Sequence, residues 1–210
     1  MKLYSYWRSS CSWRVRIALE IKALPYTYVP VHLVSKGGEQ HLRDYTAHNP
    51  MAQVPTLELI DGTTITQSIA IIEYLNEQYP KGVKLMPDSI TERARARSYA
   101  EIINAGIQPL QNLSVLQAIE AMGQDKLIWG RQVIDKGLMA LEELTASHTS
   151  RYLVGASPSI ADLCLVPQLY NARRFKCDMS RYPRLTSVES NCMALESFQR
   201  AHPDQMPDAQ

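Results

Sequence analysis

The character of the sequence changes once along the chain, near residues 80–88. Before this stretch, short segments rich in β-branched and aromatic residues alternate with helical patterns. After Pro87, every apolar pattern recurs at helical spacing. This division predicts a mixed α/β domain over residues 1–82 and an all-helical domain over residues 88–210, and a chain of 210 residues can supply a core for each.

The first part opens with a strand–helix–strand pattern. Segments 3–7 and 26–31 are short and rich in apolar and aromatic residues, which is typical of strands. Between them, apolar residues from Cys11 to Ala23 recur at helical spacing until Pro25 ends the helix. Because two strands joined by a helix pair in parallel, this segment predicts a β-α-β unit.

A hairpin signal follows in the same domain. Asp61-Gly62 separates two strand-like segments, 54–60 and 63–66, and this dipeptide strongly favours an antiparallel turn. Ser68 then precedes an apolar run that ends at Tyr79-Pro80, as expected for a capped helix. Together with the first pair, these elements predict a mixed four-stranded sheet.

Helical patterns occupy residues 89–200. Pro109 lies inside the first of them and is expected to kink or break that helix. Ser159 and Asp162 stand three residues apart before an apolar run, which is the form of a capping box at a helix start. The polar tail from Pro203 to Gln210 is expected to fray.

Composition argues against several classes of partner. The formal net charge is +1, so no overall field attracts nucleic acid or an anionic membrane. No window supplies the ~20 apolar residues of a membrane span, and the N-terminal apolar run is too short for a signal peptide, so we expect a cytoplasmic protein. The four cysteines show no C-x-x-C pair and no zinc spacing, which predicts neither a disulfide framework nor a metal site.

Three short segments carry candidate chemistry. Ser9 to Ser12, with one thiol at Cys11, stand where a strand turns into a helix, and the free N–H groups of a helix start favour an anion. Arg8 beside them favours a functional interpretation, although one serine could simply cap the helix. Val54-Pro55 begins a strand, where a cis peptide would turn the backbone and a trans edge proline is the alternative.

The third segment is Gln67-Ser68, at the start of the next helix. Its hydroxyl, amide and N–H groups could bind a carboxylate. The alternative interpretation is that this segment only caps the helix.

Five motifs, in order along nearly the whole chain, resemble those of the zeta-class glutathione transferases, that is, the maleylacetoacetate isomerases. They are SSCSWRVRIAL (9–19), NPMAQVPTL (49–57), QSIAIIEYL (67–75), GIQPLQNLS (106–114) and ADLCLVPQ (161–168). The resemblance implies a glutathione transferase architecture, with a thioredoxin-like N-terminal domain and an all-α C-terminal domain. It also implies a homodimer that binds glutathione.

The resemblance implies a role for individual residues as well. Ser9, Ser10 and Cys11 would surround the glutathione sulfur as catalytic residues. The remaining glutathione contacts would be Gln40, Val54, Pro55, Gln67 and Ser68 from the first domain, and Gln108, Asn112, Leu113 and Ser114 from the second. Arg8 and Arg174 match positions that bind the substrate's carboxylates, whereas Arg173 departs from the family pattern.

The activity implied by the resemblance is the glutathione-dependent isomerisation of maleylacetoacetate to fumarylacetoacetate in tyrosine and phenylalanine catabolism. Three alternatives stay open: a maleylpyruvate isomerase, a glutathione transferase that dehalogenates α-halo acids, and a non-catalytic interaction module. A glutaredoxin-like redox role is disfavoured, because Arg14 stands where a second cysteine would resolve a disulfide with Cys11.

Overall fold

The computed structural model describes residues 1–210, apart from the side chain of Lys36. The chain forms two compact units. The first unit contains Met1–Leu85 together with Leu195–Gln210, and the second contains Met86–Ala194. The predicted division placed residues 195–210 in the helical domain, whereas in the structure they pack with the first unit.

A four-stranded sheet is the centre of the first unit. Its strands stand in the order β2-β1-β3-β4 and comprise β1 (Lys2–Ser5), β2 (Thr27–Pro30), β3 (Thr56–Glu58) and β4 (Thr64–Thr66). β1 pairs with β2 in parallel, whereas β3 is antiparallel to both β1 and β4. The structure therefore confirms the parallel β-α-β unit, the antiparallel hairpin and the mixed sheet.

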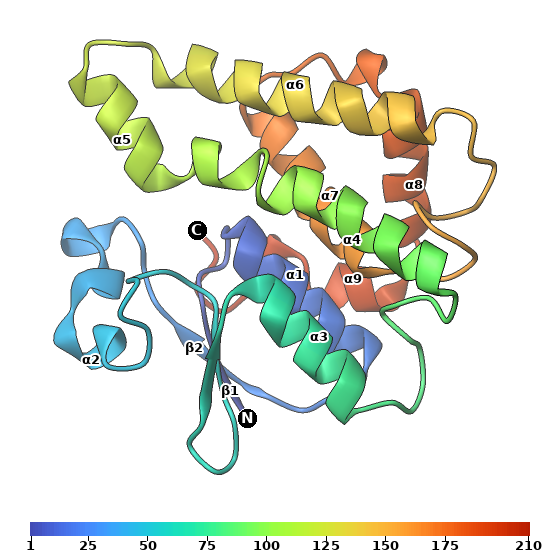
Figure 1. Ribbon diagram of the computed structural model, residues 1–210. Helices are drawn as coiled ribbons and strands as arrows, with labels where there is room; N and C mark the ends of the chain where they lie inside the picture. The colour runs from blue at the N-terminus through green and yellow to red at the C-terminus, as the bar shows by residue number, and fades with distance from the viewer. The chain divides into compact units, whose positions relative to one another are not determined.

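Two helices cover one face of this sheet. Helices α1 (Ser10–Ile21) and α3 (Ser68–Gln78) pack against each other, and the short α2 (Arg43–Thr46) lies on the opposite side of the sheet (Figure 1). Leu3 of β1 and Leu57 of β3 face each other in the sheet register, and both side chains are fully buried. This core fixes the starts of α1 and α3, where two of the predicted site segments stand.

The C-terminal segment completes the first unit with α9 (Glu196–Arg200), which packs on α1. Phe198 is fully buried, and Arg200 Nε donates to Glu20 Oε2 at 2.7 Å. The carboxylate of Asp208 accepts a 3.1 Å bond from Trp7 N–H and a 2.7 Å bond from the Tyr28 hydroxyl. The expectation of a frayed tail is therefore wrong, because its polar residues find partners on the N-terminal elements.

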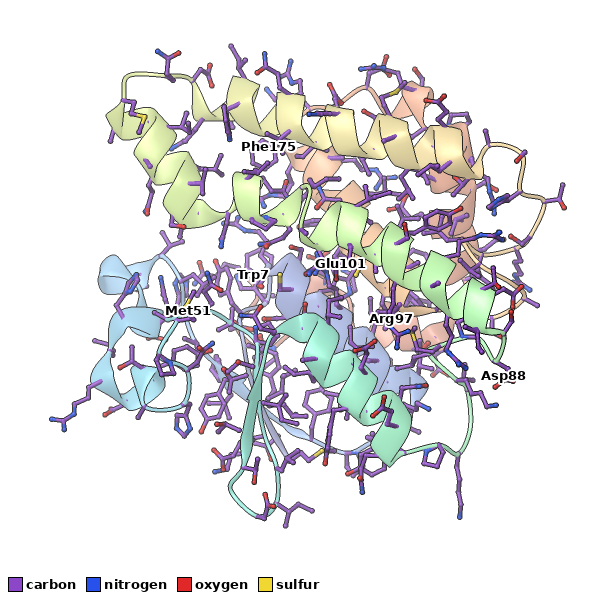
Figure 2. All side chains as sticks on the ribbon, viewed as in Figure 1. Trp7, Met51, Asp88, Arg97, Glu101 and Phe175 are labelled. Carbon is purple, nitrogen blue, oxygen red and sulfur yellow. The ribbon has the colours of Figure 1, made fainter. Side chains whose placement is uncertain are left out.

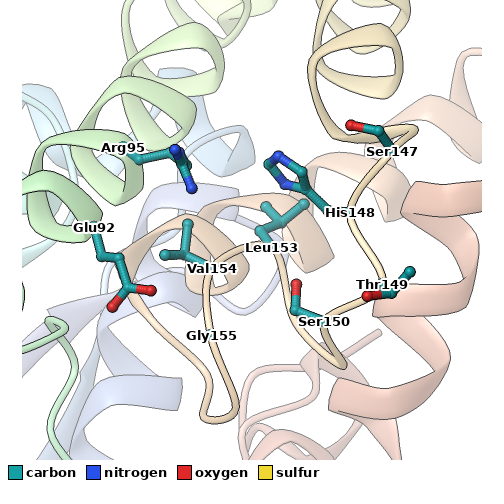
Figure 3. A pocket seen from close by; sticks show the side chains of 9 residues that line it. All are labelled: Glu92, Arg95, Ser147, His148, Thr149, Ser150, Leu153, Val154 and Gly155. Carbon is teal, nitrogen blue, oxygen red and sulfur yellow. The ribbon is translucent and has the colours of Figure 1, made fainter.

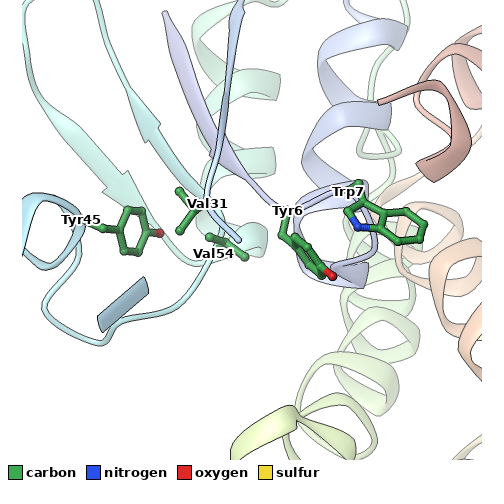
Figure 4. Close-up of a cluster of buried hydrophobic side chains, with 5 residues drawn as sticks. All are labelled: Tyr6, Trp7, Val31, Tyr45 and Val54. Atoms are coloured by element: carbon green, nitrogen blue, oxygen red, sulfur yellow. The ribbon is translucent and has the colours of Figure 1, made fainter. Parts of the chain in front are cut away.

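A cluster of buried side chains lies beside this tail. Tyr6, Trp7, Val31, Tyr45 and Val54 come from segments far apart in the sequence and gather in one place (Figure 4). Met206 and Ala209 pack against the same cluster. The cluster thus joins the turn after β1, the residues before β3 and the end of the chain.

The described residues of the second unit form helices and loops and contain no strand. Its helices are α4 (Ile90–Asn104), α5 (Leu113–Ala121), α6 (Lys126–Thr145), α7 (Ile160–Arg174) and α8 (Pro183–Met193), with short 3-10 turns at Gln108–Gln111 and Met179–Arg181. Pro109 lies in the first of these turns, after the end of α4, so the expected break is confirmed. No helix among the described residues is both long and apolar enough to cross a membrane.

Helix α7 forms the centre of the second unit, and most of its residues are buried. The predicted capping box at its start is confirmed: Asp162 Oδ2 accepts the backbone N–H of Ser159 at 2.8 Å and its hydroxyl at 3.0 Å. Oδ1 of Asp162 also accepts the N–H of Leu153 at 2.9 Å. Complete burial of Asp162 raises the pKa of its carboxyl to about 6, although these hydrogen bonds oppose the shift.

A close contact joins the end of α7 to α6. A Cβ placed on Gly130 of α6 would lie only 2.3 Å from the ring of Phe175, which follows α7 (Figure 2). Glycine is therefore required here by the close approach of the ring rather than by the backbone angles.

Candidate active site

The turn between β1 and α1 presents free hydrogen-bond donors. Ser9 is the N-cap of α1, and its Oγ accepts the N–H of Ser12 at 3.2 Å. The backbone carbonyl of Ser9 accepts the N–H of Trp13 at 2.9 Å. Among the described residues no acceptor pairs with the N–H groups of Ser10 or Cys11. The first turn contains no acidic residue. These N–H donors and the positive end of the helix can therefore bind an anion.

The hydroxyl of Ser9 has the geometry of a donor as well as a cap. A serine hydroxyl has one proton and two lone pairs, and the bond from Ser12 uses a lone pair. The proton of Ser9 is therefore available to a group that sits at the helix start. Ser10 is buried and Cys11 is partly exposed in the same turn.

A buried arginine holds this turn in place. Arg16 is fully buried, and its guanidinium donates to the carbonyls of Tyr6 at 3.3 Å and Trp7 at 2.8 Å. It also donates to Ser5 Oγ and to the carbonyl of Ala201 in the C-terminal segment. Burial lowers the pKa of Arg16 to about 10, so it stays charged at neutral pH.

The second predicted segment precedes β3. The Val54–Pro55 peptide bond is cis. Asn49 Nδ2 donates to the carbonyl of Gln53 at 2.6 Å, and the Tyr45 hydroxyl donates to the same oxygen. No hydrogen bond forms at the backbone N–H or C=O of Val54 within the described residues, which leaves both groups available to an extended peptide.

The third segment begins α3. Gln67 is the N-cap residue, has a φ of 69°, and makes no side-chain cap bond. A positive φ is strained for a residue other than glycine, and such strain concentrates at functional sites. Ser68 follows as a buried residue, and its Oγ accepts a bond from Arg14 of α1 at 3.3 Å. The first N–H groups of α3 thus lack a side-chain cap from their own helix.

Gln40 is the fourth predicted contact in the first unit. It is buried, and its Nε2 donates to the carbonyl of Leu33 at 3.3 Å. Its Oε1 is buried and has no hydrogen-bond partner within the described residues. A buried amide oxygen without a donor is costly, so this position is suited to an N–H group of a ligand.

The structure brings these segments together within the first unit. Tyr6 before the α1 turn and Val54 share the buried cluster of Figure 4, and Leu33 packs against it. The bond between Arg14 and Ser68 joins α1 to the start of α3. Arg8 stands beside this set with its guanidinium over the Trp7 ring, and it forms no hydrogen bond or ion pair within the described residues.

The remaining predicted residues belong to the second unit. Gln108 begins a 3-10 turn, Asn112 caps α5, and Leu113 and Ser114 open that helix. Trp129 braces this segment, because its indole N–H donates to the carbonyl of Leu110 at 2.9 Å.

The two neighbouring arginines at the end of α7 differ in their contacts. Arg173 forms a bidentate ion pair with Glu189, in which Nη1 lies 2.6 Å from Oε1. Arg174 is exposed, and its Nη1 reaches Asn171 Oδ1 at 3.5 Å. The departure from the family pattern at Arg173 is therefore compensated within the unit by a carboxylate.

A hollow of about 350 Å³ lies elsewhere in the second unit (Figure 3). Its walls come from α4 and from the loop between α6 and α7, with Glu92, Arg95 and His148 among the lining residues. None of the predicted site residues lines it.

The sequence analysis missed three residues that hold the site. Arg14 and Arg16 are fully buried in α1, and Asp208 binds the turn before Ser9 through Trp7. A signal for the arginines was present, because two basic residues interrupt the apolar run of α1. Nothing in the sequence pointed to Asp208, whose partners are about 200 positions away.

Comparison with known proteins identifies the family. Residues 8–78 match the family described as "Glutathione S-transferase, N-terminal domain", and residues 131–196 match "Glutathione S-transferase, C-terminal domain". The chain is 49% identical over 207 residues to maleylacetoacetate isomerase of Mus musculus, which covers 98% of this chain and 94% of that protein. The chain belongs to the glutathione S-transferase family.

Solved structures agree with this membership. A holo maleylpyruvate isomerase, described as a bacterial zeta-class glutathione S-transferase, superposes with a TM-score of 0.95 at 39% identity over 100% of both chains. Maleylacetoacetate isomerase from Anaeromyxobacter dehalogenans, with bound dicarboxyethyl glutathione and citrate, gives 0.88 at 44% identity over 100% of this chain and 97% of that one. The zeta-class resemblance and the glutathione transferase architecture are thus confirmed.

Proposed function

We propose that this glutathione transferase is a glutathione-dependent cis–trans isomerase of maleylacetoacetate. The observation that carries the proposal is the start of α1, which presents the Ser9 hydroxyl and the N–H groups of Ser10 and Cys11 with no acidic side chain in the first turn. Near-full-length similarity to maleylacetoacetate isomerases supports it. The product is fumarylacetoacetate, and the reaction belongs to tyrosine and phenylalanine catabolism.

The residues of the first unit fit glutathione. Among the described residues, Gln40 Oε1, the backbone of Val54 and the start of α3 at Ser68 have no partner or cap, and they would bind its peptide and carboxylate groups. Gln67 and Pro55 complete this set by the family motif. When bound, glutathione would supply a thiolate nucleophile that adds reversibly to the conjugated double bond and makes it a single bond that can rotate, so that the peptide is not consumed.

The start of α1 is sufficient to keep a bound thiol ionised. A free thiol has a pKa of about 8.5, and lowering it by about 2 units requires about 2.7 kcal/mol of preference for the anion. A hydroxyl that donates to the anion contributes roughly 1.5–3 kcal/mol, and the helix start adds about 0.3–1 kcal/mol. Ser9 is the main donor in this proposal, and Ser10 and Cys11 assist.

The substrate carries two carboxylates, which require positive partners. Arg8 offers a guanidinium without an ion pair among the described residues, and Arg174 is the matching position in the second unit. These charges would orient the substrate and offset negative charge that develops during the reaction. In the second unit, the family motif assigns further glutathione contacts to Gln108, Asn112, Leu113 and Ser114.

The family resemblance also supports a homodimer in the cytoplasm. Light scattering of the purified protein tests the dimer, because a particle of one chain mass at micromolar concentration would contradict it.

A second substrate is favoured by a specific observation. The maleylpyruvate isomerase noted above superposes over the whole chain. Maleylpyruvate also carries two carboxylates and a cis double bond.

Kinetics on maleylacetoacetate and maleylpyruvate, each followed by proton NMR with and without glutathione, distinguish the two substrates. We expect turnover that depends on glutathione and is faster on maleylacetoacetate. Turnover that is equal without glutathione would rule out the proposed mechanism. Release of glyoxylate from dichloroacetate at a higher rate would favour the dehalogenase, and failure to bind a glutathione resin would favour the non-catalytic module.

A further inference from the structure

A fully buried arginine stands directly behind one of the proposed glutathione contacts. Arg14 of α1 has no exposed surface, and its Nη1 donates to Ser68 Oγ at 3.3 Å. Ser68 is itself 4% exposed and is the first residue of α3. The bond therefore joins the helix that carries the thiol-binding turn to the helix that would bind a carboxylate.

The hydrogen bonds of Ser68 show which way its hydroxyl can point. A serine hydroxyl has one proton, and a guanidinium cannot accept it. The bond from Arg14 consequently occupies a lone pair of Ser68 and directs the proton away from Arg14. No described residue accepts that proton. A buried hydroxyl proton without an acceptor is unfavourable unless a ligand supplies one.

The surroundings of Ser68 select an anionic acceptor. Gln67 precedes it with a φ of 69° and no side-chain cap, so the first N–H groups of α3 stand beside the hydroxyl without a cap. A helix start favours negative charge. The guanidinium of Arg14 behind Ser68 makes the hydroxyl a stronger donor, because charge-assisted bonds polarise the groups they join.

We propose that Arg14 is a positioning residue, which turns the hydroxyl proton of Ser68 toward the γ-glutamyl carboxylate of glutathione. The inference rests on the proposed function and deepens it by assigning a role to a residue that has no exposed surface. Arg14 acts through Ser68. Without Arg14, the hydroxyl rotates freely and loses its preferred direction.

Arg16 provides a matched comparison on the same helix. It is equally buried, yet its guanidinium donates to Ser5 Oγ and to backbone carbonyls of Tyr6, Trp7 and Ala201. Its loss should disturb the turn before Ser9 and weaken every ligand alike. The loss of Arg14, whose Nη1 donates to Ser68 Oγ, should weaken most those ligands that carry the γ-glutamyl carboxylate.

The test is equilibrium binding by calorimetry, with two ligands. One ligand is glutathione, and the other is its analogue in which the γ-glutamyl α-carboxylate is a carboxamide. In Arg14→Met we expect the Kd for glutathione to rise about tenfold, which is ~1.4 kcal/mol, and the Kd for the amide to change less than twofold. Arg14→Lys retains a donor of similar reach and should stay within about threefold of the wild type.

A double-mutant cycle with Ser68→Ala shows whether Arg14 acts through Ser68. We expect Arg14→Met to cost nothing further when Ser68 is already alanine. Equal weakening of both ligands, an undiminished effect in the Ser68→Ala background, or no weakening at all would overturn the proposal. If Arg14→Met does not fold, Arg14→Gln takes its place in the same cycle.

Wild-type binding separates this inference from the proposed function. A wild-type protein that binds neither ligand overturns both. The wild type and the Arg14 variants could all bind glutathione more tightly than its amide, by the same factor. This result would support the proposed function and overturn the role of Arg14.

Discussion

Replacing Ser9 by alanine tests two roles of one hydroxyl at the start of α1, one through stability and the other through function. Its oxygen caps the helix by accepting the N–H of Ser12 at 3.2 Å, and its proton is free to stabilise a bound thiolate. Ser9→Ala removes both roles. Loss of the cap should lower the free energy of unfolding by about 1 kcal/mol.

Loss of the donated proton should have a larger effect on function. A hydrogen bond to a charged group contributes roughly 1.5–3 kcal/mol, which corresponds to a rise of about 1–2 units in the pKa of the bound glutathione thiol. Removing one donor that stabilises developing charge typically lowers kcat by about 10²-fold. Both changes are therefore well outside the error of titration and steady-state kinetics.

The assay is a pH titration of thiolate absorbance in the glutathione complex, beside urea unfolding of the same protein. Ser89→Ala is the matched control, because Ser89 caps α4 through the N–H of Glu92 and lies in the second unit. It should lose stability as Ser9→Ala does but keep the thiol pKa and kcat of the wild type. Ser9→Thr, which keeps a hydroxyl, should restore most of both.

Two results would refute this reasoning. One is a bound thiol whose pKa is the same in Ser9→Ala and the wild type. The other is a rise of the thiol pKa in Ser89→Ala equal to that in Ser9→Ala, because the effect would then follow helix stability rather than donation to the sulfur.

Three further predictions follow from contacts in each unit. Asn49→Ala removes the bonds to Gln53 O and Met51 N–H, and it should lower the urea unfolding free energy by ~2 kcal/mol and raise the KM for glutathione. Because the folded pKa of Asp162 is about 6 and its ordinary value is 3.8, its protonation stabilises the fold below pH 3.8, and this contribution is lost as the pH rises through 6. As the pH falls from 7 to 4, the free energy of unfolding of the wild type should therefore increase relative to that of Asp162→Ala. A difference in urea unfolding free energy that stays constant with pH would contradict the raised pKa. Arg174→Ala should raise the KM for the dicarboxylate about tenfold or more, whereas Arg173→Ala, which breaks only the pair with Glu189, should change it less than twofold.

Local signals in the sequence predicted the elements well where one short motif determines the geometry. Asp61-Gly62 forms the hairpin turn, with the Gly62 N–H 3.1 Å from the Leu59 carbonyl and a φ of 86° at Gly62. Ser159 and Asp162 form the capping box. In both cases the bonded groups lie within a few residues of each other. A short sequence motif therefore contains both partners of each bond.

The sequence could not predict features that depend on distant partners. Arg16 interrupts an apolar helix, and only the fold shows that carbonyls of Tyr6, Trp7 and Ala201 satisfy its guanidinium. The same holds for Asp208, whose partner Trp7 lies at the other end of the chain. The positive φ of Gln67 also depends on the junction between β4 and α3 rather than on a glycine or asparagine.

The packing of residues 195–210 on the first unit has a consequence for how a nascent chain acquires the site. The helical unit is, in sequence terms, an insertion between Leu85 and Leu195. When residues 1–85 emerge from the ribosome, the buried guanidinium of Arg16 still lacks the Ala201 carbonyl, and Trp7 N–H still lacks Asp208. The turn before Ser9 therefore receives its last supports only after the helical unit and residues 195–210 have been synthesised.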